Sequence, residues 1–190
     1  MKTYDETLKS LRAEIPDEQY VRVMYQPYCE INPDFLGFIR PYEIISEVLP
    51  KDWTVIDLGC NAAAQCFFFS KHARYVGVDL LRNREADPED IMAGIYDSTL
   101  RFESPNTEHY ESDIKDFLTE HEEITEKAKT IALCIHVPDK EATAFAEEKL
   151  SDVLIYDPEE PVRLKTTLDE KTAESIRKRL EELRKETIYR

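Results

Sequence analysis

The chain has 190 residues, 42% hydrophobic and 34% charged, which fits one globular domain, 1–190, and excludes a largely disordered chain. No run of 18 apolar residues occurs and the polar N-terminus lacks the apolar stretch of a secretory signal, so we expect a cytoplasmic protein without a membrane span. The formal net charge of −15 repels phosphate backbones, so small molecules and proteins rank above nucleic acids as substrates.

The first 50 residues predict an N-terminal helical cap. Apolar side chains at helical spacing predict a helix over residues 4–14, and Pro41 suits the first turn of a second helix that ends near Val48. Between them, residues 17–34 carry prolines and tyrosines and predict irregular structure. The residues leave open whether this cap is a lid, a substrate platform or a packing element.

Residues 53–80 predict a strand, a helix and a second strand. The first strand is apolar and β-branched and ends around Asp57, and the helix is expected over residues 61–73. The second strand, of the same character, ends in Asp79. Such a βαβ unit belongs to a parallel sheet, in which ligands bind beyond the carboxyl ends of the strands.

The rest of the chain continues the alternation of strands and helices, which predicts an α/β fold. Further helices are expected over residues 88–96, 116–127, 140–150 and 169–185, and further strands over residues 108–113, 130–137 and 152–156. The α/β core then spans residues 51–160, and residues 161–190 hold a C-terminal helix. No strand is expected after residue 156, so the sheet should have an open edge at its fifth strand.

The stretch VIDLGCNAAA, residues 55–64, resembles the first motif of class I methyltransferases, which use S-adenosylmethionine (SAM). That motif is an acid followed by spaced glycines, with a common variant D-L-G-C-N-x-G. The residues that match the variant are Asp57, Gly59, Cys60 and Asn61. Ala63 replaces the last glycine, a serious departure if its φ is positive or its Cβ meets the ligand.

Two later stretches resemble the second and third motifs of the same family. Asp79 and Leu80 match the second, whose acid accepts hydrogen bonds from both ribose hydroxyls. Asp113 and Ile114 match the third, whose acid accepts from the adenine amino group and whose next residue packs on the ring. Acids at strand ends also cap helices and turns, so each has a purely structural interpretation as well.

The resemblance implies a Rossmann-like three-layer sandwich with a mostly parallel sheet of about five strands in the order 3-2-1-4-5. Relatives add a C-terminal hairpin of two strands, which this chain is expected to lack. SAM is the implied cofactor, held by the motif residues Asp57, Gly59, Cys60, Asn61, Ala63, Asp79, Leu80, Asp113 and Ile114. No metal is expected, because the four cysteines form no C-x-x-C pair.

The leading hypothesis for function is SAM-dependent methyl transfer to a small molecule or protein. Such transfer needs mainly positioning of donor and acceptor, so no catalytic residue is forced by the sequence. His136 is the candidate, because it ends the fourth predicted strand, where the family often places catalytic residues, and an imidazole can act as a general base.

Two alternatives stay open. The glycine-poor loop favours a non-catalytic methyltransferase-like interaction or regulatory module. An NAD-dependent oxidoreductase would also use Asp79, although no G-x-G-x-x-G follows the first strand.

A homodimer is possible through the open sheet edge or the C-terminal helix. The apolar stripe on that helix consists of Ala173, Ile176, Leu180 and Leu183. Packing of this stripe within the chain is the other interpretation. Phe67, Phe68, Phe69 and Cys134 are expected in the core.

Overall fold

The structure is a computed structural model, and it describes residues 36–60, 63–80 and 104–188 of the chain. The helices predicted over residues 4–14 and 88–96 lie outside these ranges. So do the irregular segment 17–34 and Asn61 of the first motif.

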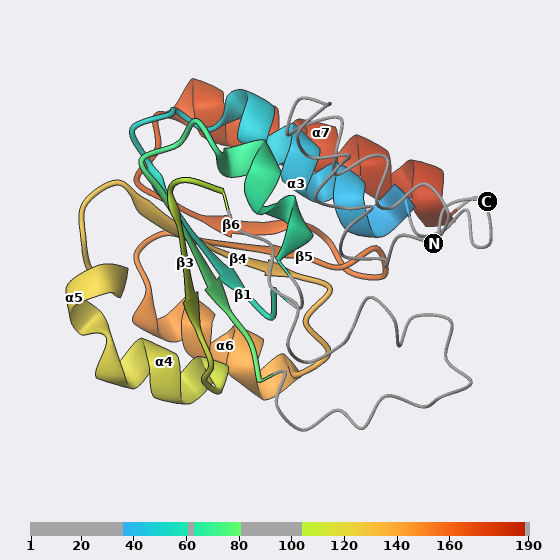
Figure 1. Cartoon of the computed structure of the whole chain (residues 1–190). Helices are drawn as coiled ribbons and strands as arrows, with labels where there is room; N and C mark the ends of the chain where they lie inside the picture. Colours follow the sequence, from blue (N-terminus) through green and yellow to red (C-terminus); the bar gives the residue numbers. More distant parts are fainter. Residues whose placement is uncertain (1–35, 61–62, 81–103, 189–190) are drawn as a thin grey trace, which may run out of the picture.

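A six-stranded sheet forms the centre of the molecule (Figure 1). Its strands are β1 (Thr54–Leu58), β2 (Arg74–Val78), β3 (Thr107–Tyr110), β4 (Thr130–Ile135), β5 (Val153–Tyr156) and β6 (Arg163–Lys165). The order is β3-β2-β1-β4-β5-β6, and all neighbours are parallel except β5 and β6. The predicted order 3-2-1-4-5 and the Rossmann-like α/β fold are therefore confirmed.

The open edge predicted at the fifth strand is wrong, because β6 pairs with β5 in antiparallel register. This strand has only three residues, Arg-Leu-Lys, which is too short for alternation to show in the sequence. Leu164 lies opposite Leu154, and the two basic residues flank it. Charged side chains on a short edge strand oppose further pairing, so β6 closes the sheet at this side.

Helices cover both faces of the sheet, as Figure 1 shows. One face carries α3 (Leu36–Val48), the 3-10 helix η2 (Ala64–Phe69) and α7 (Glu170–Ile188), and the other carries α4 (Ile114–Glu120), α5 (Glu122–Thr125) and α6 (Lys140–Lys149). Within the described part of the chain, no helix has both the length and the apolar character that a bilayer crossing requires.

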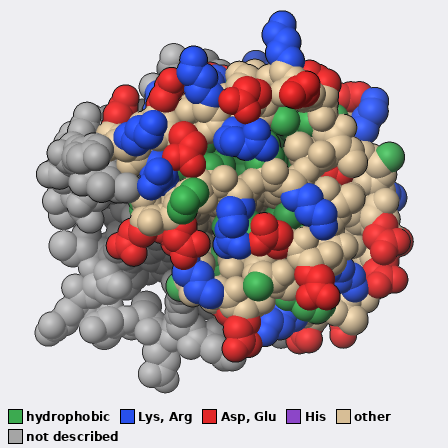
Figure 2. All heavy atoms as spheres, turned by 180° about the vertical axis from the view of Figure 1, so that it is seen from behind, with side chains coloured by type: hydrophobic (Ala, Val, Ile, Leu, Met, Phe, Trp, Pro, Cys, Tyr) green, Lys and Arg blue, Asp and Glu red, His purple; other side chains and the backbone are tan. Residues whose placement is uncertain are grey.

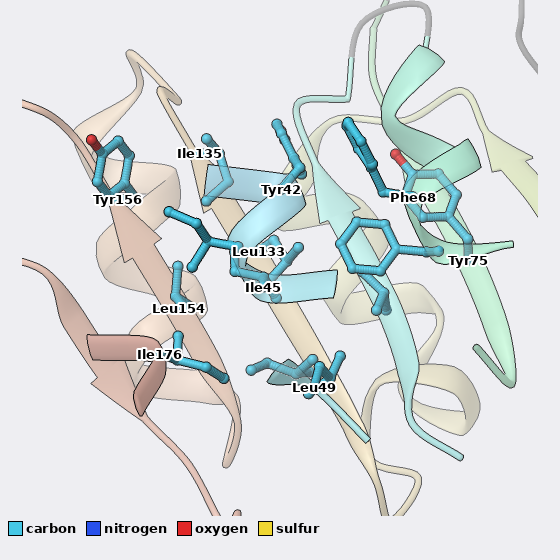
Figure 3. Close-up of a cluster of buried hydrophobic side chains, with 14 of the residues drawn as sticks. Tyr42, Ile45, Leu49, Phe68, Tyr75, Leu133, Ile135, Leu154, Tyr156 and Ile176 are labelled. Carbon is cyan, nitrogen blue, oxygen red and sulfur yellow. The ribbon is translucent and has the colours of Figure 1, made fainter. Parts of the chain in front are cut away.

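Each face of the sheet has its own hydrophobic cluster. The cluster under α3, η2 and α7 includes Ile45, Tyr75, Leu154, Tyr156 and Ile176, which Figure 3 labels. The cluster under α4 and α6 contains Cys134. The three phenylalanines of η2 belong to the first cluster, so the expectation that they and Cys134 are core residues is confirmed.

Two predicted helices differ in the structure. The helix expected over residues 61–73 is only the six-residue 3-10 helix η2, whose Phe67, Phe68 and Phe69 are all buried. The helix expected over residues 116–127 breaks into α4 and α5 at His121, whose φ of −120° and ψ of 44° are not helical. The His121 ring packs 4.7 Å from the ring of Tyr110, which fixes it against the sheet.

Helix α3 begins five residues before Pro41, so this proline lies inside the helix and not in its first turn as expected. Its apolar residues pack on the sheet and against α7, and this packing outweighs the local cost of proline inside a helix. The stripe on α7 also packs within the chain: Ala173, Ile176 and Leu180 are buried there.

Asp152 anchors the connection from β6 to α7 at the amino end of β5. Its carboxylate accepts hydrogen bonds from Thr166 Oγ1 at 2.8 Å and Thr167 Oγ1 at 3.0 Å. It is a buried acid with several donors, and it lies at the edge of the sheet opposite to the predicted motifs.

Candidate functional site

The candidate site lies at the carboxyl edge of the sheet, where the chain leaves β1 in one direction and β4 in the other. In open α/β sheets this switch in strand order opens a crevice for ligands. Gly59 follows β1 and His136 follows β4. Gly59 has φ +82°, and a Cβ at this position would meet Val137 Cγ2 at 3.2 Å. The turn after β1 therefore packs directly against the end of β4, and glycine suits it on both grounds.

The same turn is fixed to β2. The backbone N–H groups of Gly59 and Cys60 both donate to Val78 O, at 2.8 and 3.1 Å. Asp79 follows Val78 directly, and its own N–H donates to Tyr110 O at 3.2 Å. The backbone of Asp79 is thus fixed between the turn of the first motif and the end of β3, and its side chain is half-buried.

Leu80 and Asp113 lie at this edge as predicted. Leu80 is 55% exposed, the one large hydrophobic side chain among the described residues that is exposed. Asp113 is the N-cap of α4, and its Oδ1 accepts from Lys115 N at 2.8 Å. Ile114 is buried in the cluster under α4 and α6. The capping interpretation of Asp113 is therefore what the structure shows, and the cap uses one of two carboxylate oxygens.

Asp57 does not lie at the ligand edge. It is the fourth residue of the five-residue β1, and its register partner is Gly77, two residues before Asp79. Its exposed fraction is 0%, on the sheet face covered by α3 and η2. The family resemblance assigns Asp57 to the cofactor, whereas the structure places it in the core.

Three side chains donate to the buried Asp57 carboxylate. Tyr42 Oη donates to Oδ1 at 3.0 Å, Gln65 Nε2 donates to Oδ2 at 2.6 Å, and Tyr75 Oη donates to Oδ2. Burial raises the pKa of Asp57 to about 6, although all three hydrogen bonds act to lower it. These donors were not predicted from the sequence, in which the one signal is a lone glutamine within the apolar run AQCFFF.

Cys60 and Ala63 lie inside the turn. The Cys60 side chain is buried, and a Cβ on Gly77 would lie 2.9 Å from Cys60 Sγ and 2.9 Å from His109 Nδ1. Ala63 has φ 58° and ψ 29°, in the left-handed region that favours glycine. The alanine is therefore a serious departure from the glycine of the motif. Its N–H donates to Cys60 O at 2.9 Å, which closes the turn.

His136 also has a left-handed backbone, with φ 54°. Its N–H donates to Tyr156 O at 2.9 Å, and the two rings meet edge to face with centroids 5.5 Å apart. Asp157 is close by, and its Oδ2 accepts from Lys140 Nζ at 2.9 Å. Burial acts to raise the pKa of Asp157. The net effect is nevertheless a lowered pKa, because the carboxylate is stabilised by Lys140, by a backbone N–H and by His136. An imidazole beside an ionised carboxylate is a suitable arrangement for accepting a proton.

No group of three or more histidine, cysteine or acidic residues in the described ranges is arranged to hold a metal ion. The cysteines there, Cys60, Cys66 and Cys134, are buried and form no disulfide with one another. Burial raises the pKa of the Cys134 thiol to about 12, which keeps it protonated.

No family model matches the chain, and no curated protein matches it in sequence. Among solved structures, it is similar to a candidate type II methyltransferase from Anaeromyxobacter dehalogenans, with a TM-score of 0.36 and 15% identity over 61% of this chain and 46% of that one.

It is similar also to the plantazolicin methyltransferase BpumL bound to SAH, with a TM-score of 0.36 and 15% identity over 82% of this chain and 63% of that one. A second structure of BpumL, with SAH and a monoazolic desmethylPZN analog, matches with the same score and identity over 96% of this chain and 66% of that one. The chain thus spans about half to two thirds of the length of these structures.

Proposed function

We propose that the chain is a divergent class I methyltransferase that uses SAM and acts on a small molecule or a protein. The observation that carries this proposal is that Gly59 and Asp79 lie at the same edge of the sheet. A left-handed glycine turn and a half-buried acid, both tied to Val78, lie at the switch point of a Rossmann-like sheet. A backbone cradle beside a carboxylate suits a ligand with both an amino-acid part and a ribose.

The described residues fit SAM with a division of roles. Asp79 would accept from the ribose hydroxyls, and Asp113 from the adenine amino group, with Leu80 as an apolar contact. The turn at Gly59 and Cys60 would face the methionine part. SAM, when bound, supplies an electrophilic methyl group, so these residues bind and orient rather than react.

His136 is the proposed general base for an acceptor that must lose a proton. It follows β4 directly, one residue before the Val137 that lies against the Gly59 turn, and its ring meets that of Tyr156 close to Asp157. The strongly acidic chain supports a small-molecule or protein acceptor over a nucleic acid, because a net charge of −15 repels phosphates.

Calorimetric titration with SAM and with S-adenosylhomocysteine tests the cofactor proposal. Asp79→Asn keeps the shape of the side chain but replaces one acceptor oxygen by a donor, so we expect binding about tenfold to a hundredfold weaker. Asp52→Asn is the matched control, since Asp52 is an exposed acid paired with Lys129 at the other edge of the sheet. Equal affinity in wild type and Asp79→Asn would contradict the proposal, and NADH in the same titration tests the oxidoreductase alternative.

A second candidate function is a methyltransferase-like module without catalysis, and Ala63 is the observation that favours it. Its left-handed backbone carries a Cβ where relatives have glycine. Ala63→Gly separates the two functions. If the wild type binds neither ligand and Ala63→Gly binds both, the loop has lost its cofactor role. If the wild type binds both ligands, and Ala63→Gly binds them less than about threefold more tightly, the enzyme proposal stands.

A further inference from the structure

Four buried polar side chains form one hydrogen-bonded group beneath the candidate site, here named the Asp57 clamp: Tyr42, Asp57, Gln65 and Tyr75. They come from α3, β1, η2 and β2, four elements that follow one another along the chain. Each is nearly or fully buried. Figure 3 shows Tyr42 and Tyr75 among the apolar side chains of the cluster under α3.

Gln65 connects this group to the turn of the first motif. Its Nε2 donates to Asp57 Oδ2 at 2.6 Å and to Cys60 O at 3.0 Å, so both N–H donors of the amide are used. Cys60 O also accepts from Ala63 N, and Ala63 O accepts from Cys66 N at 3.0 Å. One side chain therefore holds the carbonyl around which the turn closes.

An ionised carboxylate suits the centre of this group because it only accepts hydrogen bonds. Three donors point at Asp57, two of them at the same oxygen. An asparagine there would direct an N–H₂ group at one of the donors, which would leave buried groups without partners.

The turn needs such a hold because its backbone is strained. Ala63 is a non-glycine residue with φ 58°, and residues in this region persist only when their surroundings fix them. The turn is bound to Val78 O on one side and to the clamp on the other.

We infer that Gln65, with Asp57 and Tyr42 behind it, is a positioning residue that sets the shape of the cofactor turn and couples it to α3. Asp57 is on this inference not a cofactor ligand. The part that concerns the cofactor rests on the proposed function, whereas the part that concerns the turn does not.

Gln65→Met tests the inference, since it keeps a similar volume and removes both hydrogen bonds. The readouts are amide hydrogen exchange at Ala63 and Cys66 by NMR and S-adenosylhomocysteine affinity by calorimetry. We expect exchange at these two amides to rise, and affinity to fall, by about tenfold. Amides of β4 should keep their protection.

Asp152→Asn is the matched control, because it alters another buried acid with several donors at the opposite edge. It should lower global stability but leave the Ala63 amide and the affinity unchanged. Tyr42→Phe is the milder variant, to be used if Gln65→Met does not fold, and it should raise exchange at Ala63 by a smaller factor.

Unchanged exchange at Ala63 in a folded Gln65→Met or Tyr42→Phe variant would overturn the inference. A wild type that does not bind the ligand would overturn the proposed function alone, since the exchange measurement still decides the role of the clamp.

Discussion

At the scale of single residues, the Asp57 carboxylate is fully buried, and its three hydrogen-bond donors only partly compensate for the lost hydration. Burial therefore raises its pKa to about 6, from 3.8 in a solvated aspartate. Groups that face it include Tyr42 from α3, Tyr75 from β2 and the charge of Asp79. A folded chain that holds this proton more tightly than the unfolded chain is stabilised below pH 3.8, and it loses that stability as pH rises through about 6.

We expect Asp57→Asn to remove this pH dependence. Between pH 5 and pH 7.5, the free energy of unfolding of the wild type relative to the variant should fall by about 1.5 kcal/mol, because only the wild type must ionise a buried group. Urea unfolding of both proteins at several pH values measures the difference. A constant difference across the range would mean that Asp57 ionises in the fold as easily as in water.

At the scale of elements, helix α7 and helix α3 lie against each other on one face of the sheet, as Figure 1 shows. Ile176 and Leu180 are completely buried in the cluster beneath them. A homodimer through this stripe was one of the two interpretations of the sequence, and the structure shows the residues packing within the chain. The homodimer itself, through this helix or through the sheet edge, stays a prediction.

Leu180→Ala should therefore destabilise the fold and leave the mass of the particle unchanged. Removing a fully buried leucine side chain costs about 2–5 kcal/mol through lost burial and the cavity left behind. Urea unfolding gives the first quantity and sedimentation gives the second. A change from dimer to monomer in the variant, at unchanged stability, would instead assign the stripe to an interface.

The parallel strands were predictable because strands buried on both faces consist of near-continuous apolar, β-branched residues. The pattern did not show that Asp57 lies within β1 while Asp79 follows β2, since strand ends are uncertain by a residue or two. That small shift decides whether an acid points into the core or stands at the ligand edge. β6 was missed because a strand of three residues is too short to show alternation. η2 was missed because a run of alanine and phenylalanine does not distinguish a short 3-10 helix from an α-helix.

At the scale of the whole molecule, acidic residues exceed basic ones by 40 to 25. Figure 2 shows basic side chains interspersed with acidic ones on one face of the molecule. Ion pairs among the described residues include Arg177 with Glu174 and Arg163 with Glu147. Exposed pairs of this kind contribute little each. We therefore expect the long-range repulsion among the excess acids to be the larger electrostatic effect on stability.

Added salt should stabilise the protein at pH 7. Raising NaCl from 20 to 200 mM shortens the screening length to below about 10 Å, which weakens repulsion between distant acids more than attraction within close pairs. We expect the melting temperature to rise by a few degrees, measured by circular dichroism. A fall in melting temperature would show that the ion pairs outweigh the net charge.

Because Gly77 has no side chain, β2 can pack closely against both Cys60 and His109. Any side chain at this position would collide with Cys60 on one side and His109 on the other. Sequences that descend from a common ancestor with this chain can therefore exchange the glycine only if the side chains at positions 60 and 109 shift or are replaced by smaller ones. Covariation among positions 60, 77 and 109 would then identify true relatives at identities too low for ordinary alignment, and would show which of them have kept the turn of the first motif in this shape.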